Sequence, residues 1–228
     1  VGHSILESGA DQGDGPGFRA RHDIKPGQKL LCVLAGSRQS EASRLLPVFG
    51  QVVADLCQKT PELRVVLPTV PHLRDLVTDQ VKNWPTGQGE VVSPTEKYDA
   101  MAAADAALAA SGSVALELAM AQVPTAIAYR FSPISYALAR RLVKTRYAHL
   151  LNILAGDMVV PEFIQADCTP DRIVPVVHDL LTAAAGAQQI QRTGGLLGQL
   201  HAAGGETPST KAAREILRLA TEKTPSSV

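Results

Sequence analysis

The strongest constraint in this sequence is a repeated alternation between short apolar runs and longer segments with helical periodicity. The apolar runs, expected as strands, lie at residues 29–35, 63–67, 90–92, 105–110 and 124–129. The segments between them, whose apolar residues recur roughly every 3.6 positions, are 40–57, 71–81, 94–103 and 113–122. Buried strands separated by helices are typical of a parallel sheet, because each strand is joined to the next by a helical crossover. The sequence therefore predicts an α/β fold, with a Rossmann-like parallel sheet and helices on both faces.

The two ends of the chain lack this alternation. Residues 1–28 are rich in glycine and proline, so we expect a linker segment without a regular element. The glycines between residues 13 and 17 do not form a dinucleotide fingerprint, because no strand precedes them and no helical pattern follows them. We expect one domain at 29–205 and a C-terminal helix with a frayed tail at 206–228. After Tyr129 and Arg130 the chain is expected to be mostly helical, at 133–144, 170–184, 188–201 and 208–221.

Charge and cysteine content argue against several classes of protein. The chain has 22 Lys and Arg against 22 Asp and Glu, so a general nucleic-acid-binding surface is not expected. Cys32, Cys57 and Cys168 have no C-x-x-C spacing, and no histidine lies at zinc-ligand distance. We therefore expect no metal and no cofactor, and a reducing cytoplasm. No apolar stretch reaches the roughly 20 residues of a spanning helix. The chain begins with Val1 rather than Met, and we interpret it as part of a longer protein.

Two loops that follow expected strands have residues suited to an anion. In Gly36-Ser37-Arg38, the glycine allows close approach of the backbone and the arginine offers a planar guanidinium. Ser111-Gly112-Ser113 precedes a helix whose free N–H groups and dipole favour negative charge. Ligands of open parallel sheets bind beyond the carboxyl ends of the strands, where both loops should lie. From these residues alone, a tight turn with an exposed arginine and an ordinary helix cap remain open as alternatives.

Two further polar residues are candidates for the same chemistry. Glu117 lies four residues after Ser113, one helical turn into the expected helix, where a carboxylate can accept hydrogen bonds from both hydroxyls of a ribose. The alternative is that it complements the helix dipole. Asn152, taken alone, is best interpreted as a turn residue that bonds its own backbone.

Several ordered blocks of the sequence resemble one family. Residues 110–130, ASGSVALELAMAQVPTAIAYR, are similar to lipid-A-disaccharide synthase, a glycosyltransferase that joins two acylated glucosamines. Further blocks resemble the same family in the same order, at 34–41, 138–147, 152–156 and 160–170. The resemblance runs from residue 1 to about residue 180. It implies the carboxyl-terminal, UDP-sugar-binding half of a GT-B glycosyltransferase, without the half that carries the presumed catalytic Asp.

The resemblance also implies substrates and partners. The reaction would transfer 2,3-diacylglucosamine from its UDP derivative to 2,3-diacylglucosamine 1-phosphate by an inverting displacement that releases UDP. The sequence contains no Asp-x-Asp, so the leaving diphosphate is expected to rely on amides and arginine rather than magnesium. A homodimer and peripheral binding to the cytoplasmic face of the inner membrane are also implied. Residues 136–149 interleave basic and apolar residues and could touch anionic lipid, although a solvated helix face is the alternative.

The family's functional residues carry over onto matching positions. Gly36, Ser37 and Arg38 correspond to its phosphate-side loop, Ser111, Gly112 and Ser113 to its pyrophosphate turn, and Glu117 to its nucleotide-side carboxylate. Asn152 matches an asparagine in a loop important for activity, which adds it to Arg38 as a candidate catalytic residue.

The chain also departs from the family pattern. Asp157 stands where the family has arginine, so either Lys144 or Arg146 supplies the positive charge or the loop meets its substrate differently. Two rival functions stay open at this point. One is another GT-B enzyme that uses UDP-N-acetylglucosamine, such as an epimerase or a peptidoglycan glycosyltransferase. The other is a non-catalytic nucleotide-binding or dimerisation module.

Overall fold

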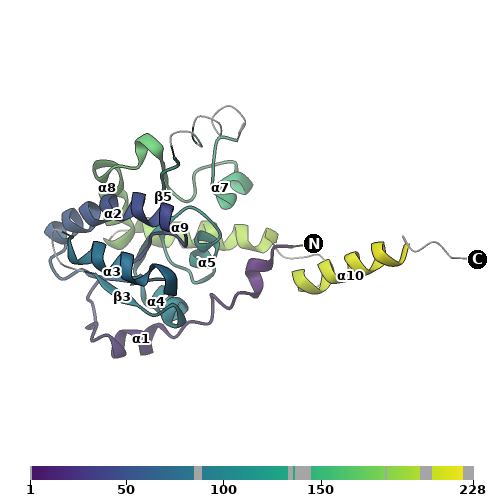
Figure 1. The fold of residues 1–228 in the computed structure, drawn as a ribbon, viewed down its shortest axis with the longest axis horizontal. Coiled ribbons are helices and arrows are strands. Elements are labelled where there is room, and N and C mark those ends of the chain that lie inside the picture. Colours follow the sequence, from purple (N-terminus) through teal and green to yellow (C-terminus); the bar gives the residue numbers. More distant parts are fainter. Residues whose placement is uncertain are drawn as a thin grey trace, which may run out of the picture.

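A six-stranded, fully parallel sheet forms the centre of the molecule (Figure 1). The computed structural model describes residues 2–84, 89–132, 136, 145–182, 184–200 and 207–222. The strands are β1 (Leu30–Leu34), β2 (Arg64–Pro68), β3 (Glu90–Val92), β4 (Ala106–Ala110), β5 (Thr125–Tyr129) and β6 (Glu162–Ile164). Their spatial order is β3-β2-β1-β4-β5-β6. The predicted α/β class is confirmed.

The order of the strands places a crevice at the middle of the sheet. The chain moves outward from β1 through β2 to β3, then returns to β4 beside β1 and continues outward through β5 to β6. Because β1 and β4 are parallel and paired from Leu31↔Ala106 to Leu34↔Ala109, their carboxyl ends lie side by side. Such a reversal of strand order is where open α/β sheets bind their ligands.

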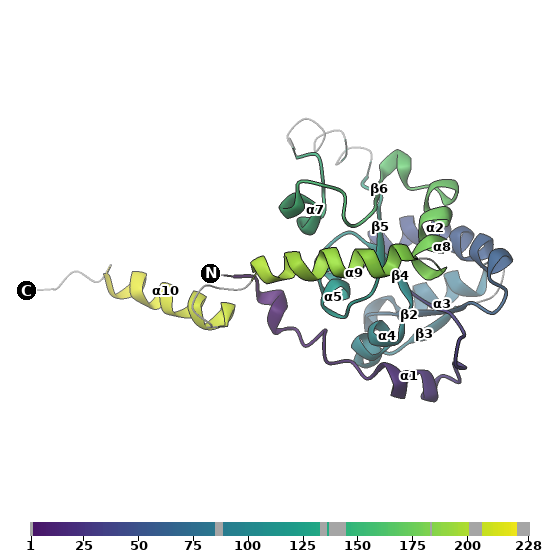
Figure 2. The same cartoon turned by 180° about the vertical axis from the view of Figure 1, so that it is seen from behind.

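Helices cover both faces of the sheet, as the alternating burial of the strands requires. In β1, Leu31 and Val33 face one core while Leu30, Cys32 and Leu34 face the other, because successive side chains of a strand point to opposite faces. The first core lies under α2 (Gln39–Lys59), α3 (Arg74–Lys82) and α8 (Pro170–Thr182). The opposite face is covered by α1 (Gly15–Arg21), α4 (Lys97–Ala103) and α5 (Val114–Met120), as the reversed view shows (Figure 2).

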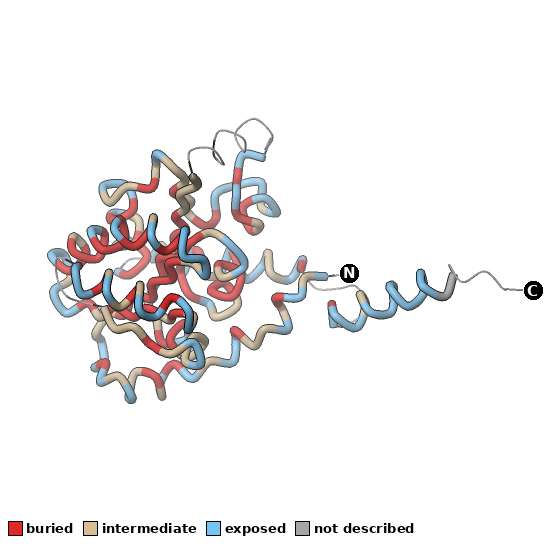
Figure 3. The backbone as a smooth tube through the Cα atoms, viewed as in Figure 1, coloured by how far each residue is buried: buried red, intermediate tan, exposed pale blue. Residues whose placement is uncertain are grey.

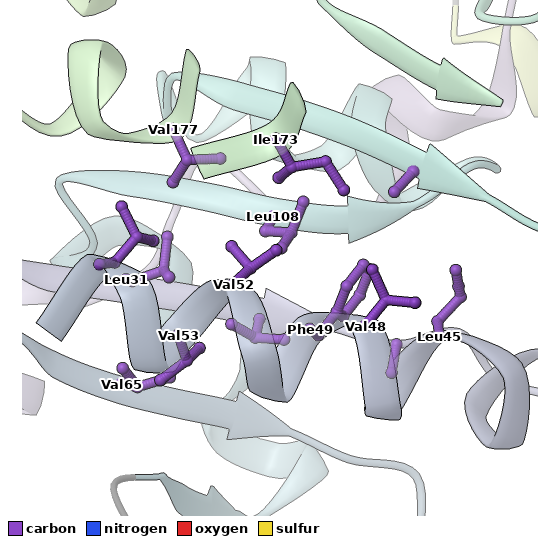
Figure 4. Packing of buried hydrophobic residues seen from close by; sticks show 14 of the residues in the cluster. Leu31, Leu45, Val48, Phe49, Val52, Val53, Val65, Leu108, Ile173 and Val177 are labelled. Atoms are coloured by element: carbon purple, nitrogen blue, oxygen red, sulfur yellow. The ribbon is translucent and has the colours of Figure 1, made fainter. Parts of the chain in front are cut away.

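The packing of α2 shows how helical periodicity builds the core. Figure 4 shows α2 and α8 lying side by side over the same face of the sheet. The α2 side chains in this cluster recur at helical spacing: Leu45, Val48, Phe49, Val52 and Val53. The tube view shows that burial is concentrated in the strands and in these facing helix surfaces (Figure 3). Burying a side chain such as that of Phe49, which is 0% exposed, contributes about 1.5–3 kcal/mol.

The expectation that residues 1–28 contain no regular element was wrong. A short 3₁₀-helix, Ser4–Glu7, and the α-helix α1 lie in this segment. Asp14 caps α1 by accepting a hydrogen bond from the amide of Gly17, and a proline follows in the first turn. Phe18 is fully buried against α4, and a Cβ at Gly15 would lie 2.5 Å from the carbonyl oxygen of Ala102. The glycine therefore serves close packing on α4, a contact that sequence spacing cannot reveal.

After residue 130, where a mostly helical chain was expected, the structure also contains the strand β6, which was not predicted from the sequence. Three residues with only Phe163 buried make too short an apolar run to be recognised. The other described elements are α7 (Leu150–Ala155), α9 (Ala184–Leu197), α10 (Pro208–Glu222) and the 3₁₀-helices 71–73, 94–96, 165–167 and 198–200. The expected helix 133–144 lies outside the described residues, apart from Tyr136.

The last described helix projects from the body of the molecule. In Figure 1, α10 extends beyond the sheet and its covering helices. Its start contacts the first 3₁₀-helix, where the amide and hydroxyl of Ser209 donate to the carboxylate of Glu7. Its predicted cap, Thr207, accepts a hydrogen bond from the amide of Thr210.

Candidate functional site

The two loops singled out from the sequence meet at one cavity of about 360 Å³. The cavity opens at the carboxyl ends of β1 and β4, where the strand order reverses. Residues of the first loop and of the second loop both line it, and Glu117 lies in the same lining. The sequence-predicted residues that it brings together are Gly36, Ser37, Arg38, Ser111, Gly112, Ser113 and Glu117.

The first loop joins β1 to α2 and presents a cation to the cavity. Gly36 has a φ of +100°, a conformation that favours glycine, and a Cβ there would lie 2.7 Å from Oε2 of Glu41. Arg38 precedes α2, and its side chain is 77% exposed. Its Nη1 donates to Oε1 of Glu41 at 2.9 Å. The exposed guanidinium is thus tethered to a glutamate that is itself buried.

Glu41 was not selected by sequence reasoning as a site residue, although it lines the cavity. It is 8% exposed, and the hydroxyl of Tyr129 also donates to its Oε1, at 2.9 Å. Burial raises the pKa of the Tyr129 hydroxyl, and the hydrogen bond and charge of Glu41 raise it further. Tyr129 therefore remains a neutral donor that holds Glu41 in place. Tyr129 lies at the end of β5, and this position is the sequence signal that could have indicated its place near the site.

The second loop joins β4 to α5 and leaves its backbone accessible. Gly112 has a φ of +152°, and nothing lies within 4 Å of the position that a Cβ would take. Ser113 precedes α5, and its side chain makes no capping hydrogen bond. The loop backbone can therefore be approached closely from the cavity.

Glu117 lies one turn into α5 and is held by two residues of α4. Its side chain is largely buried, with the residue 8% exposed. The hydroxyl of Tyr98 donates to Oε1 at 3.0 Å, and Nζ of Lys97 lies 2.6 Å from Oε2. Burial raises the pKa of Tyr98, the hydrogen bond and charge of Glu117 add to this, and a hydrogen bond with Ser8 opposes it. Sequence reasoning missed both partners, which follow β3 at the same edge of the sheet.

The charged side chains that line the cavity include as many cations as anions. Among its described lining residues, the cations are Arg38 and Lys97 and the anions are Glu41 and Glu117. Each glutamate follows the serine of its loop by four residues and is bonded to one cation and one tyrosine hydroxyl. The cavity can therefore offer cations to an anionic ligand and carboxylate oxygens to hydroxyl groups at the same time.

The structure does not bring Asn152 to this cavity. Asn152 is fully buried in α7, and all four hydrogen-bonding positions of its amide are used. Nδ2 donates to the carbonyl of Val160 at 2.7 Å and to Oε1 of Glu162 at 2.6 Å, while Oδ1 accepts from the amides of Val159 and Val160 at 2.8 Å. These hydrogen bonds connect α7 to the segment that precedes β6 and to the first residue of β6. A catalytic contact for Asn152 stays a prediction.

Asp157 forms an ion pair that the sequence did not suggest. Its Oδ2 lies 2.6 Å from Nη2 of Arg192 in α9. The hydrogen bond from Arg192 is the main cause that lowers the pKa of Asp157. Of the two alternative cations, Lys144 lies outside the described residues, and the guanidinium of Arg146 lies over the ring of Tyr147 at 5.4 Å.

The part of the chain that the structure describes offers neither a metal site nor a membrane-spanning helix. No group of three or more His, Cys, Asp and Glu side chains there is arranged to hold a metal ion. The three cysteines are buried, and burial raises the pKa of Cys32 to about 12. Within the same residues, no helix combines the length and apolar character needed to cross a bilayer.

The likeness to solved structures concerns the fold. WaaG, a glycosyltransferase involved in lipopolysaccharide biosynthesis, is 15% identical with a TM-score of 0.53, covering 87% of this chain and 50% of that one. The C-terminal domain of a glycosyl transferase group 1 family protein from Francisella tularensis is 13% identical with a TM-score of 0.53. That match covers 80% of this chain and 90% of the other. The sheet and its helices thus have the same fold as about half of WaaG and as most of this C-terminal domain.

The likeness to known sequences is much closer. A family model described as lipid-A-disaccharide synthetase matches residues 1–202. Lipid-A-disaccharide synthase of Rhodospirillum centenum is 46% identical over 227 residues, which cover 98% of this chain and 56% of that protein. The enzyme of Paramagnetospirillum magneticum is 46% identical over 226 residues, covering 95% and 56%. The chain spans little more than half the length of these relatives. It belongs to the lipid-A-disaccharide synthetase family.

Proposed function

We propose that this chain is the donor-binding part of a glycosyltransferase of lipid A biosynthesis. The whole enzyme would transfer 2,3-diacylglucosamine from its UDP derivative to 2,3-diacylglucosamine 1-phosphate, giving lipid A disaccharide and UDP. The observation that carries this proposal is the meeting of residues 36–38 and 111–117 at one cavity of a chain from this family. The rival function, another enzyme that uses UDP-N-acetylglucosamine, is less well supported, because the family model that matches residues 1–202 is that of lipid-A-disaccharide synthetase.

The diphosphate of the donor would lie between the two loops. Gly36, Ser37, Ser111, Gly112 and Ser113 offer backbone and hydroxyl donors around the cavity, and Arg38 adds a guanidinium. Negative charge grows on the diphosphate as the bond to the sugar breaks, so donors already aimed at it lower the barrier. One preorganised donor of this kind is typically worth about 3 kcal/mol.

The ribose of the donor would lie at Glu117. An ionised carboxylate accepts about four hydrogen bonds, of which Tyr98 and Lys97 each supply one. The remaining positions suit the two hydroxyl groups of a ribose. Because charge-assisted bonds are stronger than neutral ones, Glu117 would contribute both affinity and the orientation of the nucleoside.

Acceptor binding and turnover would require the half of the enzyme that the longer relatives possess. We propose that this chain binds the donor but hardly turns it over alone, and that Asn152 acts by holding the loop between α7 and β6. Because both substrates carry acyl chains, the whole enzyme would work at the cytoplasmic face of the inner membrane, as a homodimer.

Calorimetry of the chain with UDP tests the donor site. We expect binding that weakens in Arg38→Ala through the loss of a phosphate contact and in Glu117→Gln through the loss of nucleoside contacts. UDP affinity that is unaltered in both variants would remove these residues from the site.

Mixing the chain with a separately made amino-terminal half tests its role as a half-enzyme. Release of UDP in the presence of both acylated substrates is expected from the mixture and not from either part alone. Strong UDP binding by the chain with no release from a folded mixture would favour a non-catalytic nucleotide-binding module.

A further inference from the structure

Helix α4 starts with Lys97 and Tyr98, which contact opposite oxygens of Glu117. Building on the proposed function, we propose that these two side chains are positioning residues that set the preference of the site for a ribonucleotide over a deoxyribonucleotide. Glu117 would touch the ribose, and Lys97 and Tyr98 would act through Glu117. The start of α4, which follows a different strand from either loop, would thus determine nucleotide specificity.

The two contacts fix the rotation of the carboxylate. The last torsion of a glutamate side chain is broad, so a single hydrogen bond leaves its two oxygens free to change places or tilt. Tyr98 holds Oε1 at 3.0 Å and Lys97 holds Oε2 at 2.6 Å, so both ends of the carboxylate are tied to α4. One acceptor position on each oxygen remains for a ligand. Two acceptors at a fixed spacing match two neighbouring hydroxyl groups.

The contacts also balance the charge of a carboxylate that has lost most of its water. Glu117 is 8% exposed, and an ionised group in such a place is costly without a partner. The ammonium of Lys97 supplies that partner and lines the same cavity, with its side chain 30% exposed. An ionised Glu117 is what a hydroxyl donor requires, because a carboxylate accepts stronger hydrogen bonds than a neutral acid or amide.

The neighbouring glutamate provides a matched comparison within the same cavity. Glu41 also bonds a tyrosine hydroxyl and a cation, but Tyr129 and Arg38 both donate to the same oxygen, Oε1. Its cation is 77% exposed, whereas Lys97 is 30% exposed. Glu41 is therefore tied at one oxygen and Glu117 at two. Tyr129→Phe removes the same chemical group as Tyr98→Phe without touching Glu117.

The test compares binding of UDP and 2′-deoxy-UDP to the chain by calorimetry. The wild-type chain is expected to favour UDP, and Glu117→Gln is expected to lose most of that preference. Tyr98→Phe and Lys97→Met should each reduce the preference about fivefold, the effect of one hydrogen bond. Lys97→Arg, which keeps the positive charge, should retain more of the preference for UDP than Lys97→Met does. Tyr129→Phe should leave the ratio of the two affinities unchanged.

The outcomes separate this inference from the proposed function. If Glu117→Gln loses the preference while Tyr98→Phe and Lys97→Met keep it, the inference is wrong and the ribose site stands. If the wild-type chain does not bind UDP, or binds both nucleotides equally, the ribose site itself fails and the inference fails with it. Should Lys97→Met not fold, Tyr98→Phe decides the matter, because it removes a single oxygen. A substitution that merely disturbed the structure would lower the affinities for UDP and 2′-deoxy-UDP equally.

Discussion

Nη1 of Arg38 lies 2.9 Å from Oε1 of Glu41, three residues further along the chain. The cation that we assign to the donor's phosphates is therefore already paired with a carboxylate. A phosphate that binds Arg38 must compete with this pair, so the arginine contributes less than an unpaired cation would. The pair also favours a position of the guanidinium at the edge of the cavity, beside Glu41.

Arg38→Ala is expected to weaken UDP binding about tenfold. A hydrogen bond to a charged group is worth about 1.5–3 kcal/mol, and breaking the exposed pair with Glu41 offsets about 0.2–1 kcal/mol of that. Binding of uridine, which has no phosphate, should be unchanged. Calorimetry with both ligands measures the difference. An equal loss for uridine and UDP would contradict a phosphate contact.

Asn152→Ala is expected to cost about 2–4 kcal/mol of folding free energy. The change removes the Asn152 partner of the amide and of the carbonyl of Val160, which are buried. The carboxylate of Glu162 keeps the amides of Ala148 and His149, and the amide of Val159 keeps the carbonyl of Asp157. Urea denaturation measures the loss. UDP affinity should change little, since Asn152 does not line the cavity.

A variant of similar shape sharpens this prediction. Asn152→Asp can still accept from the two amides but cannot donate to Val160 and Glu162, so it too should be destabilised. If Asn152→Ala instead kept full stability and abolished transfer in the complemented enzyme, Asn152 would be catalytic rather than structural.

His22 should make stability fall as the pH rises. Its ring hydrogen-bonds Glu90 at 2.7 Å and Glu96 at 3.1 Å and stacks on Phe18. Burial, the largest single influence, lowers its pKa, but the hydrogen bonds and charges of Glu96 and Glu90 together outweigh it and raise the pKa above the ordinary 6.5. The stabilisation is thus complete below pH 6.5 and is lost as the pH rises through the folded-state pKa. Urea denaturation measures the free energy of unfolding at about pH 6, roughly half a unit below the ordinary histidine pKa, and at about pH 8, more than one unit above it. The decrease in this free energy between the two pH values should be smaller for His22→Gln than for the wild-type chain.

His149 should have the opposite effect at acid pH. It is 3% exposed, its ring nitrogens have no hydrogen-bond partner among the described residues, and burial lowers its pKa to about 4 although Glu162 opposes this. The unfolded chain therefore takes up a proton near pH 6.5 that the folded chain resists, so stability is complete above 6.5 and falls as the pH drops toward 4. The loss between pH 7 and pH 5 is on the order of 2 kcal/mol.

His149→Phe should remove this contribution. Replacing an unpartnered buried ring by an apolar one of similar shape is close to neutral at pH 7. Thermal unfolding at pH 7 and pH 5 is the measurement, and a wild-type acid sensitivity that persists in His149→Phe would assign it to other groups.

The elements that follow from local periodicity were predictable from the sequence. The β1–α2 and β4–α5 units could be located because in each an apolar run is followed by a segment whose apolar residues recur at helical spacing. The glycine and serine residues between the run and the helix indicate the loops. The parallel arrangement then places both loops at one edge of the sheet. Segments with few apolar residues, such as β6, or with glycines used for packing, such as the start of α1, gave no comparable signal.

The contacts of Glu117 depended on the tertiary structure. Lys97 and Tyr98 are about twenty residues away in sequence, and nothing in their own segment indicates that they meet a carboxylate on α5. The same holds for Tyr129 with Glu41 and for Asn152 with β6. The order and angles of the strands decide these pairs. Local periodicity determines which face of an element is buried, whereas the partner of a polar side chain is determined by which elements the folded sheet places next to each other.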